Sequence, residues 1–192
     1  MLTPKQLHTL MLNKAKGSLL SPKDVAQLKF QVFTEEQSQK LDIFPKWAGF
    51  QIPYFDLKGK TTEFFRFRYL QDRPSTGFAA LGDPVGKVRR YGQPSGSGSH
   101  VYLPPLLDQS WAEIAADPSV SLVITEGELK AACACSLGVP CIGLGGVYNW
   151  RAGKQGQELI PDLEAFRWED RHLVLCFDSD VSTNHMVRSA LA

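Results

Sequence analysis

Carboxylate side chains follow two apolar segments in the second half of the chain, where they could bind a metal ion. Glu126 comes after Leu122–Ile124, and Asp178 and Asp180 come after Leu173–Phe177. Phosphoryl transfer needs charge neutralised on phosphate oxygens, and Mg²⁺ held by one or two carboxylates does this. The spacing therefore predicts a metal site with Asp178 and Asp180 as ligands and Glu126 as a further ligand or a general acid/base.

Helix capping is the alternative role for the aspartate pair. Asp180 stands just before a helix that we expect to start near Ser182, and aspartate is a common N-cap residue. For an isolated D-x-D tripeptide, capping is the better explanation. Glu126-Gly127 at the end of another strand favours the metal site instead.

The elements that must position these carboxylates alternate between strand and helix. Short apolar segments predict buried strands, and the residues between them have helix composition. Such alternation predicts an α/β fold with a parallel sheet flanked by helices, whose ligands bind beyond the carboxyl ends of the strands. The expected strands are 122–124, 139–142 and 173–177, and the expected helices are 128–137, 159–166 and one from about 182.

The first half of the chain predicts short helices followed by a β-hairpin. Capping patterns at Thr3, Ser21 and Thr34 indicate three helix starts, and a fourth short helix is expected over residues 110–116. The segment 52–70 alternates as two strands around Gly59, which suits a tight turn. We therefore expect a helical and β-hairpin portion over residues 1–100, followed by the α/β domain over residues 101–192.

Positive charge is concentrated in the first half, although the net charge of the whole chain is only +1. Residues 1–100 hold 15 of the 21 Lys and Arg residues but 8 of the 20 Asp and Glu residues. This predicts a basic strip for nucleic acid, with solvated surface charge as the alternative. The candidate nucleic-acid-binding residues are Arg66, Arg68, Lys87, Arg89 and Arg90, together with Lys130, Arg151 and Lys154 in the second half.

The second half resembles the Toprim domain shared by bacterial-type primases, topoisomerases and certain nucleases. The motifs that carry the resemblance are Ile124–Gly127, Gly138–Pro140 leading to Gly143–Gly146, and Leu175–Asp180. Gly146–Trp150 makes the chain most similar to the Toprim-like domain of phage and plasmid replication proteins, often fused to a primase-helicase. The resemblance covers roughly residues 40–192 and is specific from residue 121 onward.

The resemblance implies that Glu126 is the general acid/base and that Asp178 and Asp180 bind Mg²⁺ or Mn²⁺. It implies a primase-type nucleotidyl transfer on single-stranded DNA with nucleotides as substrates, and a helicase domain or subunit as partner. Two other functions stay open, a catalytically inactive module that binds nucleic acid or recruits a helicase, and a Toprim-type nuclease. Lys130 stands where many primases have an aspartate, so it could contact phosphate or mark weakened metal chemistry.

The composition excludes several classes of protein. No apolar segment approaches the length of a membrane helix, and the first residues do not form a signal peptide. The chain has 4 cysteines and no C-x-x-C pair, which predicts reduced thiols in a cytoplasm. Because the chain stops at Ala192, one expected helix after the aspartates, we expect either a fragment of a longer replication protein or a degenerate remnant.

Overall fold

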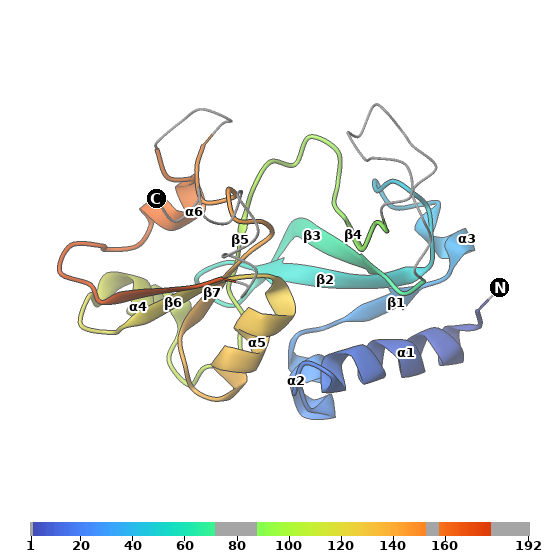
Figure 1. The fold of residues 1–192 in the computed structure, drawn as a ribbon, viewed down its shortest axis with the longest axis horizontal. Coiled ribbons are helices and arrows are strands. Elements are labelled where there is room, and N and C mark those ends of the chain that lie inside the picture. The colour runs from blue at the N-terminus through green and yellow to red at the C-terminus, as the bar shows by residue number, and fades with distance from the viewer. Residues whose placement is uncertain (1, 72–87, 153–157, 178–192) are drawn as a thin grey trace.

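The protein has a mixed α/β fold with two four-stranded sheets (Figure 1). The computed structural model describes residues 2–71, 88–152 and 158–177. The helices are α1 (Pro4–Lys16), α2 (Pro22–Gln27), α3 (Glu35–Ser38), α4 (Trp111–Ala116), α5 (Glu128–Ser136) and α6 (Pro161–Glu164). The strands are β1 (Gln31–Phe33), β2 (Gly49–Phe55), β3 (Thr61–Tyr69), β4 (Tyr91–Gly92), β5 (Val101–Tyr102), β6 (Leu122–Glu126), β7 (Cys141–Leu144) and β8 (Leu173–Cys176).

The first sheet is antiparallel and has the order β1-β2-β3-β4. Strands β2 and β3 form the expected hairpin, and Gly59 lies in its turn with a φ of 75° that favours glycine. Phe67 and Tyr69 of β3 are buried on one face of the sheet, while Arg66 and Arg68 contact the Tyr91 ring of β4 on the other. Phe67 and Tyr69 therefore lie on the opposite face of β3 from Arg66 and Arg68.

Capping side chains start the helices where the sequence predicts them. Thr3, Ser21, Thr34 and Ser110 each accept a hydrogen bond from the backbone N–H three residues later. In each case the side chain of that later residue accepts from the cap backbone, so two unpaired N–H groups are satisfied at once. These contacts fix the start of α1, α2, α3 and α4.

The second sheet has the order β5-β7-β6-β8, and β6 runs parallel to both of its neighbours. The predicted parallel arrangement is therefore confirmed, with β5 added as an antiparallel edge strand. Helix α5 links β6 to β7, and in Figure 1 it lies on the opposite side of these strands from α6. β7 lies two residues later than predicted, α6 is shorter than predicted, and the helix expected near Ser182 lies outside the described residues.

Strand β8 is exposed, so the prediction that it is buried was wrong. Leu173, Val174 and Leu175 are 39%, 41% and 47% exposed. β8 is an edge strand whose only pairing in the described part of the chain is with β6. An apolar segment of this length predicts a strand but does not tell a central strand from an edge strand.

Exposure of β8 leads to a testable difference in reactivity among three of the four thiols. Cys176 on β8 is exposed, whereas Cys135 and Cys141 are buried and burial raises the pKa of both thiols to about 12. Because the thiolate is the nucleophile, we expect iodoacetamide at neutral pH to modify Cys176 well before Cys135 and Cys141. Peptide mass spectrometry of the native protein over time measures these rates. Equal rates for the three thiols would contradict the exposure of β8.

One apolar core joins the two sheets. Phe50, Ile52 and Tyr54 of β2 belong to the same buried cluster as Tyr102 of β5 and Ile142 of β7. The chain crosses between the sheets in the segment that separates β4 from β5. The division into residues 1–100 and 101–192 stays a prediction. No helix within residues 2–71, 88–152 and 158–177 is long and apolar enough to cross a membrane.

Candidate functional site

Glu126 lies at the carboxyl end of the central strand β6. It is in register with Leu144 of β7, whose carbonyl oxygen accepts a 2.7 Å hydrogen bond from the Gly127 N–H. The φ of 99° at Gly127 lets the chain turn sharply from β6 into α5. This turn leaves the Glu126 side chain half-buried at the edge of the sheet where ligands bind in α/β folds.

The two predicted aspartate ligands, Asp178 and Asp180, lie outside the described residues. The strand that precedes them in sequence, β8, pairs with β6, and Thr125 is in register with Cys176. The carboxyl ends of β6 and β8 therefore lie side by side, as the sequence predicted for the strands that carry the carboxylates. In the described part of the chain, no three His, Cys, Asp or Glu side chains are grouped so that they could hold a metal ion. The Glu126 carboxylate is a hard oxygen donor, the type of ligand that Mg²⁺ prefers.

Glu128 is the buried acid of the site, and it belongs to a network that sequence reasoning missed. It is the first residue of α5, and its side chain is 2% exposed. The Tyr54 hydroxyl donates a 2.9 Å hydrogen bond to Glu128 Oε1, and Arg66 Nη1 lies 3.6 Å from the same oxygen. Tyr54 and Arg66 come from the first sheet, so the network fastens that sheet to the start of α5.

Arg66 also holds the glycine turn that follows β7. Its Nη1 donates a 3.1 Å hydrogen bond to the Gly145 carbonyl oxygen. A Cβ on Gly145 would lie only 2.0 Å from Arg66 Nη1, so residue 145 has to be glycine while Arg66 keeps this position. The Arg66 side chain is 11% exposed, and its buried Nε–H has no hydrogen-bond partner in the part of the chain that the structure describes. Arg66 therefore lies beneath the surface, between the glycine turn and α5.

Several of the other predicted nucleic-acid-binding residues lie near Arg66. Arg68 lies with its Cζ 4.5 Å from the centre of the Tyr91 ring, Arg89 donates a 3.3 Å hydrogen bond to the Phe44 carbonyl oxygen, and Arg90 is exposed. These three form one basic region with Arg66. Of the remaining predicted residues, Lys130 is exposed on α5, and Arg151 lies with its Cζ 4.7 Å from the Tyr148 ring centre. Lys87 and Lys154 lie outside the described residues.

Buried tyrosines around the network make the fold sensitive to alkali. Burial, and next the Glu128 charge, raises the pKa of Tyr54 and of Tyr102 well above the ordinary value, and burial raises the pKa of Tyr69 to about 12. Unfolded tyrosines ionise near pH 10, so their contribution to stability is complete below that pH and is lost as the pH rises above it.

We therefore expect the melting temperature to fall as the pH is raised above about 10. Thermal melting between neutral pH and pH 11, followed by circular dichroism, measures this. Tyr54→Phe should flatten the pH dependence because residue 54 can then no longer ionise in the unfolded chain. A melting temperature that stays constant through this range would contradict the burial of the tyrosine hydroxyls.

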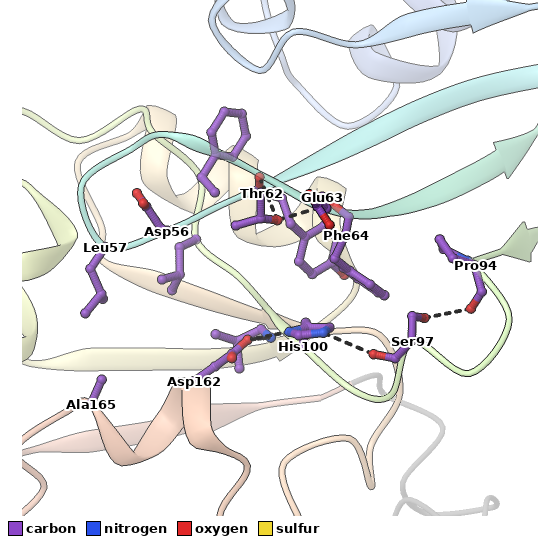
Figure 2. Close-up of a pocket in the computed structure, with 14 residues that line it drawn as sticks. Asp56, Leu57, Thr62, Glu63, Phe64, Pro94, Ser97, His100, Asp162 and Ala165 are labelled. Atoms are coloured by element: carbon purple, nitrogen blue, oxygen red, sulfur yellow. Dashed lines mark hydrogen bonds and ion pairs between the residues drawn. The ribbon is translucent and has the colours of Figure 1, made fainter. Parts of the chain in front are cut away.

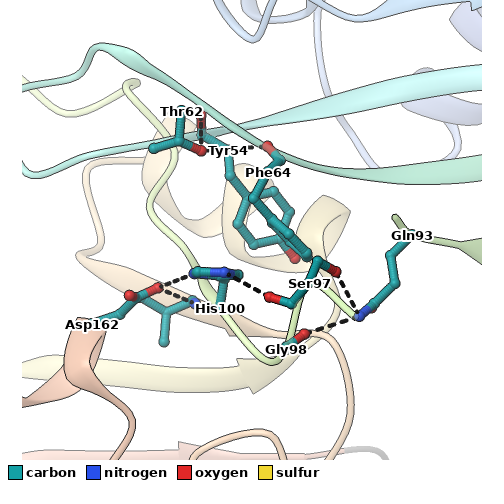
Figure 3. A network of polar contacts seen from close by, with 9 residues as sticks. Tyr54, Thr62, Phe64, Gln93, Ser97, Gly98, His100 and Asp162 are labelled. Atoms are coloured by element: carbon teal, nitrogen blue, oxygen red, sulfur yellow. Dashed lines mark hydrogen bonds and ion pairs between the residues drawn. The ribbon is translucent and has the colours of Figure 1, made fainter. Parts of the chain in front are cut away.

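A cavity of about 610 Å³ lies between the β2–β3 hairpin and α6 (Figure 2). His100 lies in its wall, with Nδ1 3.1 Å from Asp162 Oδ2 and Nε2 3.1 Å from the Ser97 carbonyl oxygen (Figure 3). Asp162 Oδ2 also accepts a 3.0 Å hydrogen bond from the Val101 N–H. These contacts hold the segment before β5 against α6 and fix the orientation of the His100 ring.

The fold and the site define an α/β protein with a carboxylate at the end of a central parallel strand. Residues 110–192 match the model of a family described as a domain of unknown function, DUF3854. An uncharacterized protein of Picosynechococcus sp. (strain ATCC 27264 / PCC 7002 / PR-6) is 35% identical over 89 residues, which cover 42% of this chain and 9% of that protein. The similarity thus spans a small part of the relative's length. No solved structure matches this chain.

Proposed function

We propose that the chain is a Mg²⁺-dependent nucleotidyl-transfer module of the primase type, from a phage or plasmid replication protein. The observation that carries the proposal is the position of Glu126 at the carboxyl end of β6, beside the end of the strand that Asp178 and Asp180 follow in sequence. Carboxylates at adjacent strand ends suit metal-assisted phosphoryl transfer. The sequence resemblance to Toprim-like domains points to the same chemistry.

Each residue has a role in this proposal. Asp178 and Asp180 bind Mg²⁺ or Mn²⁺, which when bound neutralises charge on the phosphate oxygens. Glu126 accepts or donates the proton at the reacting hydroxyl. The other predicted cations guide a single-stranded DNA template by pairing with its phosphates. They are Arg68, Lys87, Arg89, Arg90, Lys130, Arg151 and Lys154. Arg66 acts mainly by holding Glu128 and the Gly145 turn.

We place the protein in the cytoplasm.

A binding module without catalysis is the second candidate function. Lys130 favours it, because an exposed lysine on α5 replaces an acidic residue four positions after Glu126. In that case the same fold binds nucleic acid or recruits a helicase. A Toprim-type nuclease, which would use the same carboxylates to cut DNA, is the third.

Product analysis separates the three functions. The protein is incubated with Mg²⁺ or Mn²⁺ and single-stranded DNA, with and without nucleoside triphosphates. Chain extension that is lost in Asp178→Asn/Asp180→Asn supports the primase, and cutting of the supplied DNA without nucleotides supports the nuclease. Salt-sensitive DNA binding that survives in the variant, with neither product formed, supports the binding module. Asp108→Asn, which changes an exposed aspartate elsewhere, is the matched control.

A further inference from the structure

Two cavities adjoin the segment 93–99 between β4 and β5. One, of about 340 Å³, is lined by Arg66, Arg89 and Tyr91. The other is the cavity of about 610 Å³ that is lined by Phe64 and His100. Pro94 lines both cavities, so both adjoin the same segment. Neither includes Glu126, so this region is distinct from the proposed metal site.

Strand β3 places an aromatic ring and an arginine side by side along these cavities. Phe64 and Arg66 are two residues apart on β3 and therefore project from the same face of the sheet. Two residues of extended strand span about 7 Å, so each side chain contributes to its own cavity. Figure 2 shows the Phe64 ring directed toward Ser97 and His100. A ligand that extended past Pro94 from one cavity into the other would meet a cation at one end and a ring at the other.

The arginine end has the chemistry of a phosphate site. Arg66 and Arg89 line the smaller cavity, and Arg68 packs on the Tyr91 ring beside it. The guanidinium group carries a permanent charge and a fork of N–H donors that matches phosphate oxygens. Two carboxylates lie close by: Glu128 pairs with Arg66, and Asp42 accepts a hydrogen bond from the Ser95 N–H. Among the described residues, three arginines and two carboxylates lie at or beside this cavity, which leaves an excess of positive charge for an anion.

The other end has the chemistry of a base pocket. The Phe64 ring is buried, and the His100 ring lies 4.4 Å from it between centroids, with 42° between the planes. Three acids line this larger cavity: Glu63 is exposed, whereas Asp56 Oδ1 already accepts from the Lys58 and Lys60 N–H groups and Asp162 Oδ2 from the Val101 N–H, so one oxygen of each aspartate is left for a ligand. Carboxylates accept hydrogen bonds from amines and repel phosphate. A ligand is therefore oriented, with its phosphates at the arginine end and an amine-bearing ring at the acidic end.

We propose that the two cavities together bind one nucleotide whose base carries an exocyclic amine, with adenosine triphosphate as the probe. The phosphates contact Arg66 and Arg89, and the base lies in the cavity beside Phe64 and His100. The acids in that cavity select adenine, guanine or cytosine over uracil, which lacks an exocyclic amine. Because this site needs no metal ion and no residue of the carboxylate cluster, it stands independently of the proposed catalysis.

Metal-free titration calorimetry in EDTA tests the proposal. Four probes are titrated into the full chain: ATP, UTP, inorganic triphosphate and a short single-stranded DNA. ATP should bind more tightly than UTP and triphosphate. Arg89→Gln should lower the affinity for ATP about tenfold because a charge-assisted contact with phosphate is lost. Glu63→Gln, which changes an exposed acid, should narrow the preference for ATP over UTP while triphosphate binds no more weakly.

Arg167→Gln is the control because this exposed arginine lies on the segment after α6, and it should leave ATP binding unchanged. ATP binding that Arg89→Gln does not weaken would overturn the proposal, as would equal binding of ATP and triphosphate. Binding of the DNA alone would also overturn it, since the anion would then be a nucleic-acid backbone. Failure of metal-dependent catalysis has no effect on this metal-free titration, so the two proposals fail separately.

Discussion

Replacing Arg66 with methionine is expected to lower the free energy of unfolding by about 3 to 5 kcal/mol. The substitution removes the cation from Glu128, whose side chain is 2% exposed, and leaves a buried carboxylate without its ion pair. It also removes the hydrogen bond to the Gly145 carbonyl oxygen. Urea unfolding followed by circular dichroism measures the change. A buried charge without its partner is one of the few defects that cost a protein this much.

Two further variants separate the ion pair from simple loss of packing. Arg68→Met removes an arginine from the same strand, whose Cζ lies 4.5 Å from the Tyr91 ring centre and which pairs with no buried carboxylate of the described residues. This substitution should cost about 1 kcal/mol or less. Glu128→Gln combined with Arg66→Met should recover part of the lost stability because the buried charge is gone. If Arg66→Met costs no more than Arg68→Met, the network does not join the sheets as described.

The second large effect is expected at Glu126. Glu126→Gln should lower the metal-dependent rate about 10²-fold to 10⁴-fold, because the amide keeps the shape of the side chain but cannot accept or donate the catalytic proton. The substitution should leave the melting temperature nearly unchanged, since Glu126 is only half-buried. Rate assays with Mg²⁺ and single-stranded DNA, beside thermal melting of the same preparation, measure both quantities.

Glu128→Gln is the matched control for Glu126, two residues further along the chain. It should lower the melting temperature through the Arg66 network and leave the metal dependence of the rate intact. The two glutamates thus separate chemistry from stability. If both variants lose rate equally without loss of stability, the distinct roles assigned to Glu126 and Glu128 are wrong.

Local signals in the sequence were sufficient to predict much of the fold. The capping residues Thr3, Ser21 and Ser110 act on atoms three residues away, so a short stretch of sequence contains the whole interaction. The same holds for the turn at Gly59. The alternation of strands and helices predicted the parallel pairs of β6 with β7 and β8. These features depend on neighbours along the chain and need no knowledge of distant contacts.

Distant contacts account for what the sequence did not predict. An acidic residue at the start of a helix is usually an exposed partner of the helix dipole, so Glu128 carried no signal of its burial against Tyr54 and Arg66. Arg66 likewise appeared to belong only to a solvated or DNA-binding face. Leu173–Cys176 was correctly predicted as a strand but wrongly as a buried one, since exposure depends on what packs against it. The positions of Asp178 and Asp180 stay predictions.

Thermal melting with added Mn²⁺ or Mg²⁺ tests the central claim most directly. Wild-type protein and Asp178→Asn/Asp180→Asn are melted across a metal titration. Clustered carboxylates repel one another when empty, and a metal that binds only the folded state stabilises it by about 2.7 kcal/mol at a hundred times its dissociation constant. The account predicts that metal raises the melting temperature of the wild type and not that of the variant. An equal response from both proteins would contradict the metal site and with it the proposed catalysis.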